Sequence, residues 1–444
     1  MMLVTTDNNV LELTKEHDVD KVNLSLIANK SIKSLVVSNI NLLVFPQHLK
    51  INDDNIEKEC VFELNDNMLI TSNIMGFIGI NDTQLKIQSR FAQAVDENHE
   101  DYFLHYMLQK VFCISLFDLK HSQKQSSLFD FLIYMFPYFL KKALAQGLYK
   151  EYHKKVYNNA NIKGAISINR HIKQNMPFRG NVAYSVREQS FDNRITQLIR
   201  HTIEFIKHNE TMRDILHVDS DTQKFVNLII QHTPSYYTSD RSSIINKNLK
   251  PFAHPYFFEY AGLQSICIKI LRYDGLKYAN SDNRAHGILF DGAWLWEEYL
   301  NTLLKEVGFL HPQNKQSKGG IRVFSKPNSG SSPQRFPDFV NDNDANKLIL
   351  DAKYKWMRKG NVSRDDMNQI ISYLYLYKAN IGGFISPTNQ KNSYEDMGVL
   401  SGYGGSIYKF KLAIPQNVDS FHDFVRAIRA NEYALTNSIQ SYQF

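Results

Sequence analysis

Short apolar runs alternate with asparagine- and aspartate-rich turns along residues 1–95 of this chain. Apolar runs of four to eight residues that are bounded by turn residues are typical of β-strands. The pattern therefore predicts a β-rich N-terminal region. The predicted strands are Ser34–Val37, Leu42–Phe45, Ile74–Ile80 and Leu85–Gln88.

Residues 96–284 contain longer apolar runs with the spacing of a helix, and they predict a mainly helical middle region. The most apolar run of the chain, Leu128–Leu140, is too short to cross a bilayer and contains Asp130 and Pro137. We expect it to form a buried helix. The helices predicted here run from about Glu97 to Leu116, Ser127 to Asn158, Asn193 to Ile229 and Tyr256 to Tyr278.

Residues 285–444 combine both patterns. Asp291–Glu306 has apolar residues at helical spacing, and Ser363 is a good N-cap for a second helix that reaches Tyr377. A predicted β-hairpin lies between these helices, and a strand at Ile381–Ser386 follows them. Strands and helices in this order predict a mixed α/β sheet with helices packed on it.

The predicted hairpin carries the most informative chemistry. Asp338 ends its first strand, a turn at Asn341–Asn346 follows, and Asp351 and Lys353 lie on its second strand. Residues two apart on a strand share a face, so Asp351 and Lys353 should project together. Two carboxylates beside a lysine suit a divalent cation that activates water against a phosphodiester.

Each residue type has a role in such chemistry. Asp338 and Asp351 provide hard oxygen ligands for Mg²⁺ or Mn²⁺. Lys353 would orient or deprotonate the attacking water, or stabilise the negative charge of the transition state. The alternative is a surface hairpin whose charges form exposed ion pairs, and the tripeptide Asp351–Lys353 alone favours that alternative.

Further candidates lie on the two flanking helices. Glu297 and Glu298 are acidic residues in the middle of the first helix, and we choose Glu297 as a third metal ligand. Gln369 and Tyr373 are four residues apart on the second helix and so share one face. Either acidic residue would, taken alone, be expected on a solvated helix face.

These residues, in this order, resemble the motif of the PD-(D/E)xK nuclease superfamily. Its core is a helix, three antiparallel strands, a helix and a further strand. Pro337, Asp338, Asp351 and Lys353 match the motif, Glu297 matches the acidic residue of the first helix, and Gln369 and Tyr373 match a Gln-x-x-x-Tyr pattern that some members carry.

A second resemblance covers the middle of the chain. The segment Gly164–Gly180 precedes Asp192-Asn193 and a long helix at Ile195–Ile206. This arrangement is similar to the McrC family, the nuclease subunit of modification-dependent restriction systems such as McrBC. Together the two resemblances cover roughly residues 60–440. They imply an endodeoxyribonuclease of antiphage defence that cleaves double-stranded DNA containing modified cytosine, such as 5-methylcytosine.

The McrC resemblance also implies a partner, a hexameric McrB-like AAA+ motor that hydrolyses GTP or ATP and that docks on the N-terminal region of this chain. The chain has no Gly-x-x-x-x-Gly-Lys-[Ser/Thr] segment, so we expect it to bind no nucleotide itself. Two alternatives stay open. One is a sequence-specific restriction subunit of the LlaJI type, and the other is a non-catalytic adaptor that stimulates an AAA+ NTPase.

Length and composition agree with a large globular enzyme. The 444 residues exceed what one core usually supports, which favours a multidomain α/β protein with domains at 1–95, 96–284 and 285–444. The net charge of +6 is compatible with a polyanionic partner such as DNA. Three widely spaced cysteines and a polar N-terminus indicate a cytoplasmic protein without a disulfide framework or secretory signal, and no membrane association is expected.

Overall fold

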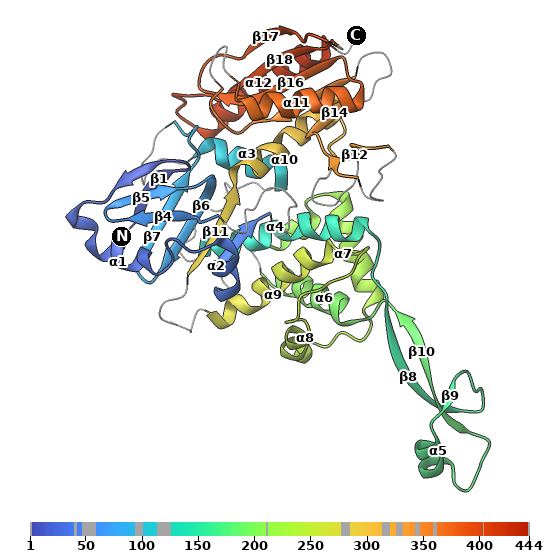
Figure 1. Ribbon diagram of the computed structural model, residues 1–444. Helices are drawn as coiled ribbons and strands as arrows, with labels where there is room; N and C mark the ends of the chain where they lie inside the picture. The colour runs from blue at the N-terminus through green and yellow to red at the C-terminus, as the bar shows by residue number, and fades with distance from the viewer. Residues whose placement is uncertain are drawn as a thin grey trace. The chain divides into compact units, whose positions relative to one another are not determined.

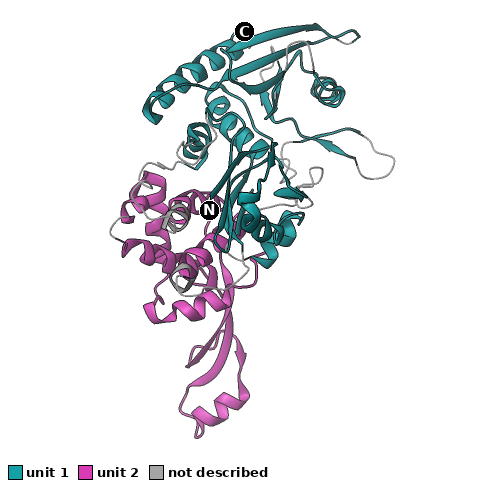
Figure 2. Ribbon diagram, turned by 90° about the vertical axis from the view of Figure 1, so that its left-hand side faces the viewer, with its two compact units in different colours: residues 1–117, 281–444 teal, residues 118–280 magenta. Residues whose placement is uncertain are grey.

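The structure is a computed structural model of the whole chain. It describes residues 2–39, 42–46, 59–93, 101–112, 126–209, 212–276, 285–312, 320–325, 332–341, 347–357, 362–402 and 404–442. The chain divides into two compact units (Figure 2). Unit 1 contains residues 1–117 and 281–444, and unit 2 contains residues 118–280.

Unit 1 begins with a five-stranded sheet in the order β1-β7-β6-β11-β3. β1 pairs parallel with β7 and β3 pairs parallel with β11, whereas β6 is antiparallel to both of its neighbours. A smaller antiparallel sheet, β2-β5-β4, and two helices share its hydrophobic core. The bounds are β1 Met2–Thr6, β2 Val10–Glu12, α1 Asp18–Ser25, α2 Ile32–Ser38, β3 Leu42–Phe45, β4 Phe62–Asn65, β5 Met68–Thr71, β6 Ile74–Ile80, β7 Thr83–Gln88 and β11 His286–Asp291.

The β-rich character of the N-terminal region is confirmed, with one correction. The predicted strand Ser34–Val37 lies in helix α2, because the Ser31 side chain caps the helix by accepting a hydrogen bond from the Ser34 N–H. Ile32 and Leu35, one helical turn apart, are buried, while Val37 is 83% exposed. A segment with two adjacent valines therefore forms a helix here because its cap and its buried face outweigh a weak strand propensity.

The C-terminal part of unit 1 contains a second five-stranded sheet, in the order β14-β15-β16-β18-β17. β15, β16 and β18 run parallel, and the edge strands β14 and β17 are antiparallel to their neighbours. The bounds in this part are α10 Gly292–Leu304, β12 Ile321–Arg322, β13 Gln334–Arg335, β14 Phe339–Asn341, β15 Leu348–Ala352, α11 Arg364–Tyr377, β16 Ile381–Thr388, β17 Ser393–Val399, β18 Ser406–Ala413 and α12 Phe421–Gln440. Helix α3, Tyr102–Phe112, belongs to the first segment of unit 1.

The predicted helices and hairpin of this part are confirmed, with one correction: Asp338 directly precedes the first strand instead of ending it, and Lys353 directly follows the second strand, so both lie at the open end of the hairpin. Asp291 caps α10, Ser363 caps α11, and Gly308 ends the first helix region with the positive φ that favours glycine. The outer edge of β14 is joined to Leu310 by two hydrogen bonds with Val340, of 2.8 and 2.9 Å. α11 packs on one face of the sheet against Ile349 and Phe384. The hairpin turn at residues 342–346 lies outside the described residues.

Unit 2 consists of a helical bundle and a projecting β-ribbon. The bundle contains α4 Ser126–Ala145, α6 Arg194–Lys207, α7 Ser220–His232, α8 Arg241–Lys247 and α9 Tyr260–Leu276. The ribbon contains β8 Glu151–Asn159, β9 Ala165–Ile166, α5 Ile168–Asn175 and β10 Val182–Ser190. Figure 1 shows β8 and β10 running away from the bundle with β9 and α5 at the far end, and we call this ribbon, residues 151–190, the arm.

The arm corrects the prediction of one helix from Ser127 to Asn158. Helix α4 ends at Ala145, and β8 begins at Glu151 and pairs along its whole length with β10. Half-buried and exposed residues alternate at the start of β8, as a strand requires. The buried-helix prediction for the apolar run is confirmed, since Ile133, Met135 and Phe136 of α4 are fully buried.

No helix in the described part of the chain has both the length and the apolar character that a bilayer crossing requires. Cys60 and Cys267 are free thiols, and Cys113 lies outside the described residues.

His201 of α6 makes unit 2 sensitive to acid. The side chain is 1% exposed, and burial and the nearby Arg241 lower its pKa from 6.5 to about 4. The unfolded chain therefore binds a proton below pH 6.5 that the folded chain rejects, and stability falls as the pH drops from 6.5 toward 4.

We predict that His201→Phe, which keeps a ring against Tyr236, makes the free energy of unfolding less sensitive to acid. The decrease between pH 6.5 and pH 4 should be smaller by up to about 3 kcal/mol. Thermal unfolding of both proteins at a series of pH values from 7 to 4 measures the difference. An unchanged pH dependence in the variant would contradict the assignment.

Candidate active site

The register of the β14–β15 hairpin brings the two predicted aspartates together. Phe339 lies opposite Leu350 and Asn341 opposite Leu348, so the same register, continued by one residue, places Asp338 opposite Asp351. The Asp338 carboxylate accepts a hydrogen bond from the Ala352 N–H at 2.7 Å. Both carboxylates therefore lie at the same end of the hairpin.

Asp351 on β15 and Lys353, which directly follows β15, lie on the same side of the hairpin, toward α11. Asp351 is 1% exposed, and one of its oxygens lies 2.6 Å from the Lys353 ammonium nitrogen. The same ammonium donates a hydrogen bond to the Gln369 side-chain oxygen at 2.9 Å. The predicted face-sharing of Asp351 and Lys353 is thus present, with α11 providing the third contact.

Gln369 and Tyr373 extend this contact across α11. The Gln369 amide donates to the Tyr373 hydroxyl at 3.0 Å, and that hydroxyl donates to the Phe336 carbonyl oxygen at 3.0 Å. Phe336 lies two residues before Asp338. A chain of hydrogen bonds therefore runs from Lys353 through Gln369 and Tyr373 of α11 to the segment that carries Asp338.

Glu297 approaches the same place from α10, where its side chain is hydrogen-bonded to that of Asp338. The preceding residue, Trp296, is fully buried, and its indole N–H donates to the Ile385 carbonyl oxygen at 3.3 Å. That carbonyl also accepts the Lys353 backbone N–H at 2.8 Å. All six predicted residues, from Glu297 to Tyr373, are thus brought to one end of the second sheet.

Burial and mutual repulsion shift the acid–base behaviour of these groups. Burial, reinforced by Glu297, raises the pKa of Asp338 well above its ordinary value. Burial and the Asp338 charge raise the pKa of Asp351 to about 8, although Lys353 opposes the shift. Burial disfavours the charged lysine, but the Asp351 carboxylate outweighs it and raises the pKa of Lys353. Without a cation, Lys353 therefore offsets only part of the negative charge that gathers at the site.

The donor set fits a hard divalent cation. Both Asp351 carboxylate oxygens are buried without a hydrogen-bond donor in suitable geometry, although one forms the close ion pair with Lys353. Buried carboxylate oxygens in this situation are costly unless a cation or proton neutralises them. Among the described residues, no three acidic, histidine or cysteine side chains form a ready-made metal cluster. Mg²⁺ commonly needs only one or two carboxylates, because it keeps several of its waters.

Asp366, in the first turn of α11, is a further contact of the site that was not predicted from the sequence. Its carboxylate lies 3.4 Å from the Lys353 ammonium and 2.5 Å from that of Lys355, and it accepts the Ser363 hydroxyl at 2.6 Å. Burial opposes ionisation, but these partners lower the pKa of Asp366. The signal in the sequence was its position three residues before Gln369, which places both on one helix face.

A comparison with known protein families places the chain in one of them. A family model described as "McrBC 5-methylcytosine restriction system component" matches residues 69–387, which is more than half of the chain. The chain therefore belongs to the family of McrBC 5-methylcytosine restriction system components. No curated protein matched the chain in the sequence comparison.

Two solved structures show distant similarity. A Thermococcus gammatolerans assembly of McrB AAA+ hexamers with bound McrC matches with 14% identity and a TM-score of 0.44, over 97% of this chain and 100% of that chain. The Thermococcus gammatolerans McrBC complex matches with 15% identity and a TM-score of 0.29, over 69% of this chain and 87% of that chain.

The pKa shifts predict different effects of two amide substitutions. A carboxyl whose pKa is raised in the folded state loses stability as the pH rises from about 4 to about 8. Asp351→Asn should therefore weaken the fall in stability of the cation-free protein over this pH range, whereas Asp366→Asn, which removes a carboxylate with a lowered pKa, should destabilise the protein at neutral pH. Thermal unfolding in a chelating buffer at a series of pH values measures both, and an unchanged pH dependence of Asp351→Asn would contradict the assignment.

Proposed function

We propose that this chain is the McrC-type nuclease subunit of its restriction system, a Mg²⁺-dependent DNA endonuclease with a PD-(D/E)xK site. One observation carries the proposal: Asp338 and Asp351 meet at the end of one hairpin, with Lys353 beside Asp351. Membership of the McrBC family makes DNA the expected substrate and modified cytosine the expected signal. A binding protein would not need buried carboxylates that repel phosphate.

Asp338 and Asp351 would hold the cation, with Glu297 as a further ligand through its contact with Asp338. When bound, Mg²⁺ supplies a Lewis acid that makes water more acidic and offsets phosphate charge. The raised pKa and the contacts to Asp351, Asp366 and Gln369 favour a protonated Lys353. Of its possible roles, we therefore assign Lys353 the stabilisation of negative charge on the phosphate in the transition state.

Gln369 and Tyr373 would act by holding Lys353. The Lys353 ammonium has three N–H donors, and its contacts with Gln369 and Asp366 leave it little freedom to turn away from Asp351. Tyr373 links Gln369 to the backbone at Phe336 and so couples the lysine to the Asp338 segment. Fixed donors of this kind reduce the reorganisation that the transition state requires.

The proposed partner is a hexameric McrB-like AAA+ motor that hydrolyses GTP or ATP, because this chain has no P-loop of its own. The chain's family is that of a restriction system with more than one component, and the similar Thermococcus assembly joins McrB hexamers to McrC. In the LlaJI-type alternative, the restriction system reads an unmodified DNA sequence instead of a modified base. In the adaptor alternative, this chain stimulates the motor but does not cleave DNA.

Two exposed apolar surfaces are candidates for the contact with this motor. The end of the arm exposes Ile166, Ile168, Ile172, Met176 and Phe178, each at least half exposed. In the N-terminal region, Val19 and Val22 are 74% and 66% exposed on one side of α1. Apolar side chains gathered on a surface commonly mark a protein contact. The N-terminal docking that the McrC resemblance implies would use the second surface.

Cleavage by the assembled system tests the nuclease proposal. We predict that Asp351→Ala lowers plasmid cleavage by about 100-fold or more, because the site loses a metal ligand, while assembly with the motor is retained. The assay contains the chain, its motor, Mg²⁺ and GTP or ATP, with cytosine-methylated and unmethylated plasmid. Asp219→Ala, at an ion pair with Lys141 in unit 2, is the matched control and should cut as the wild type does.

Each outcome of this assay separates the alternatives. Cleavage of methylated DNA alone, lost in Asp351→Ala, supports the modification-dependent nuclease. Cleavage of unmethylated DNA supports the LlaJI-type subunit. Equal cleavage by Asp351→Ala overturns the site, and nucleotide hydrolysis stimulated without any cleavage supports the adaptor.

A paired set of surface variants locates the motor contact. We predict that Ile172→Asp with Phe178→Asp on the arm weakens binding of the motor by about tenfold or more, because two apolar contacts become buried charges. Val19→Asp with Val22→Asp on α1 is the matched pair. Size-exclusion chromatography with the motor measures both, and a loss confined to the α1 pair would assign the contact to the N-terminal region.

A further inference from the structure

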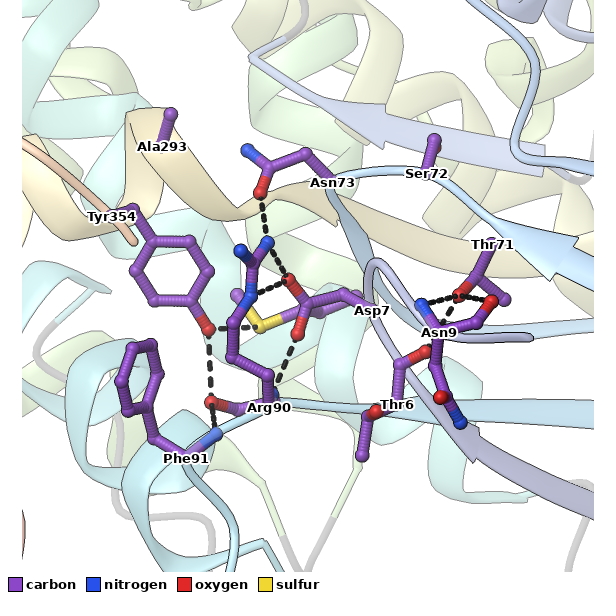
Figure 3. Close-up of polar contacts among 12 residues, drawn as sticks. Thr6, Asp7, Asn9, Thr71, Ser72, Asn73, Arg90, Phe91, Ala293 and Tyr354 are labelled. Atoms are coloured by element: carbon purple, nitrogen blue, oxygen red, sulfur yellow. Dashed lines mark hydrogen bonds and ion pairs between the residues drawn. The ribbon is translucent and has the colours of Figure 1, made fainter. Parts of the chain in front are cut away.

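Arg90 lies where the N-terminal sheet of unit 1 meets the elements that carry the candidate site. It follows β7, and its guanidinium group forms an ion pair with Asp7, which follows the edge strand β1. Two guanidinium nitrogens donate to one Asp7 carboxylate oxygen, the Nε at 2.7 Å, and the Arg90 backbone N–H donates to the other oxygen at 2.6 Å. Asp7 is 1% exposed, so this arginine is its buried counter-charge (Figure 3).

Two series of contacts, which we call routes, connect Arg90 with the candidate site, and the first passes through Tyr354. The guanidinium carbon lies 4.9 Å from the centre of the Tyr354 ring, within the range of a cation–π contact. The Tyr354 hydroxyl donates to the Met75 sulfur at 3.2 Å and lies 2.9 Å from the Ser89 hydroxyl. Tyr354 directly follows Lys353, so the N-terminal sheet holds the residue next to the lysine of the site (Figure 3).

A second route leads to helix α10 through Asn73. Arg90 donates to the Asn73 side-chain oxygen at 2.5 Å, and the Asn73 amide donates to an Asp291 carboxylate oxygen at 3.3 Å. That same oxygen caps α10 by accepting the Ala293 and Trp294 N–H groups at 2.8 and 3.3 Å. The second turn of α10 carries Glu297.

Gly292, the first residue of α10, contacts both routes, since it lies against Asn73 and Tyr354. Its backbone N–H donates to the Asn73 carbonyl oxygen at 2.8 Å. A Cβ atom on Gly292 would lie 2.7 Å from the Tyr354 ring, so the helix start approaches this ring as closely as only glycine allows. The helix start and the Tyr354 ring cannot shift independently of each other.

We infer that Arg90 is a positioning residue for the nuclease site, and that it ties the site's geometry to the N-terminal sheet. This inference rests on the proposed function. Lys353 contacts Asp351 and Glu297 contacts Asp338. Arg90 reaches the residue after Lys353 directly, and it reaches the start of the helix that carries Glu297 through Asn73 and Asp291. Loss of the forked Arg90 contacts would loosen Lys353 and Glu297 together, without removing any group that touches metal or DNA.

Arg90→Lys tests the inference, because lysine keeps the charge opposite Asp7 but lacks the planar fork that binds Asp7 and Asn73 together. Tyr354→Phe removes the hydroxyl contacts and keeps the ring. We expect each variant, in the full chain assembled with its motor, to lower kcat and to raise the Mg²⁺ concentration for half-maximal cleavage, by about tenfold for Arg90→Lys. KM for DNA should stay within about twofold.

Thr71→Val is the matched control. The Thr71 side chain is 3% exposed in the same N-terminal region, where it accepts the Asn9 N–H at 2.9 Å and donates to the Thr6 carbonyl oxygen at 2.7 Å (Figure 3). The change weakens this region without altering either route to the site. It should lower the melting temperature while kcat and the Mg²⁺ requirement stay unchanged.

Amide hydrogen exchange gives a readout that needs neither cleavage nor metal. In the full chain alone, Arg90→Lys should speed exchange at the Lys353, Ala293 and Trp294 amides, and Thr71→Val should not. Unchanged exchange at these amides, or equal effects of Thr71→Val, overturns the inference. A wild-type assembly that fails to cut DNA overturns the proposed function, while the exchange result still decides the role of Arg90.

Discussion

The candidate site depends on one buried ion pair, between Asp351 on the second strand of a short hairpin and Lys353 directly after that strand. Asp351 is almost fully buried, and Lys353 is the cation in contact with it. Burying one of these charges without the other would be strongly unfavourable. The lysine in turn needs its own partners, and α11 provides them through Gln369 and Asp366. The ion pair therefore requires that α11 packs on the hairpin in one fixed position.

Negative charge exceeds positive charge at this point of the described structure. Asp338, Asp351 and Glu297 gather beside the Lys353 ammonium, and burial together with their mutual repulsion raises the pKa values of both aspartates. A protein under selection for stability alone would replace such carboxylates with amides or apolar residues. Retaining a costly arrangement is typical of a site whose missing positive charge comes from a ligand. A divalent cation supplies that charge in the proposed nuclease.

Unit 1 also joins segments that are far apart in the chain. β11, from residues 286–291, is a central strand of the N-terminal sheet and leads directly into the helix that carries Glu297. Tyr354, next to Lys353, packs against residues of β6 and of the segment after β7. The N-terminal sheet and the site therefore share one set of packed and hydrogen-bonded residues.

The sequence by itself determined the local elements and the chemistry of the site. Strong periodicity and caps predicted α10, α11 and the β14–β15 hairpin, and strand alternation placed Asp351 and Lys353 on one face. It failed at Ser34–Val37 and at residues 151–158, where helix and strand propensities are similar and tertiary contacts decide the outcome. Only the tertiary structure placed β11 in the N-terminal sheet, Asp366 beside Lys353 and Arg90 against Tyr354. These contacts join residues far apart in the chain or on separate elements, and no local pattern encodes which distant partner a side chain meets.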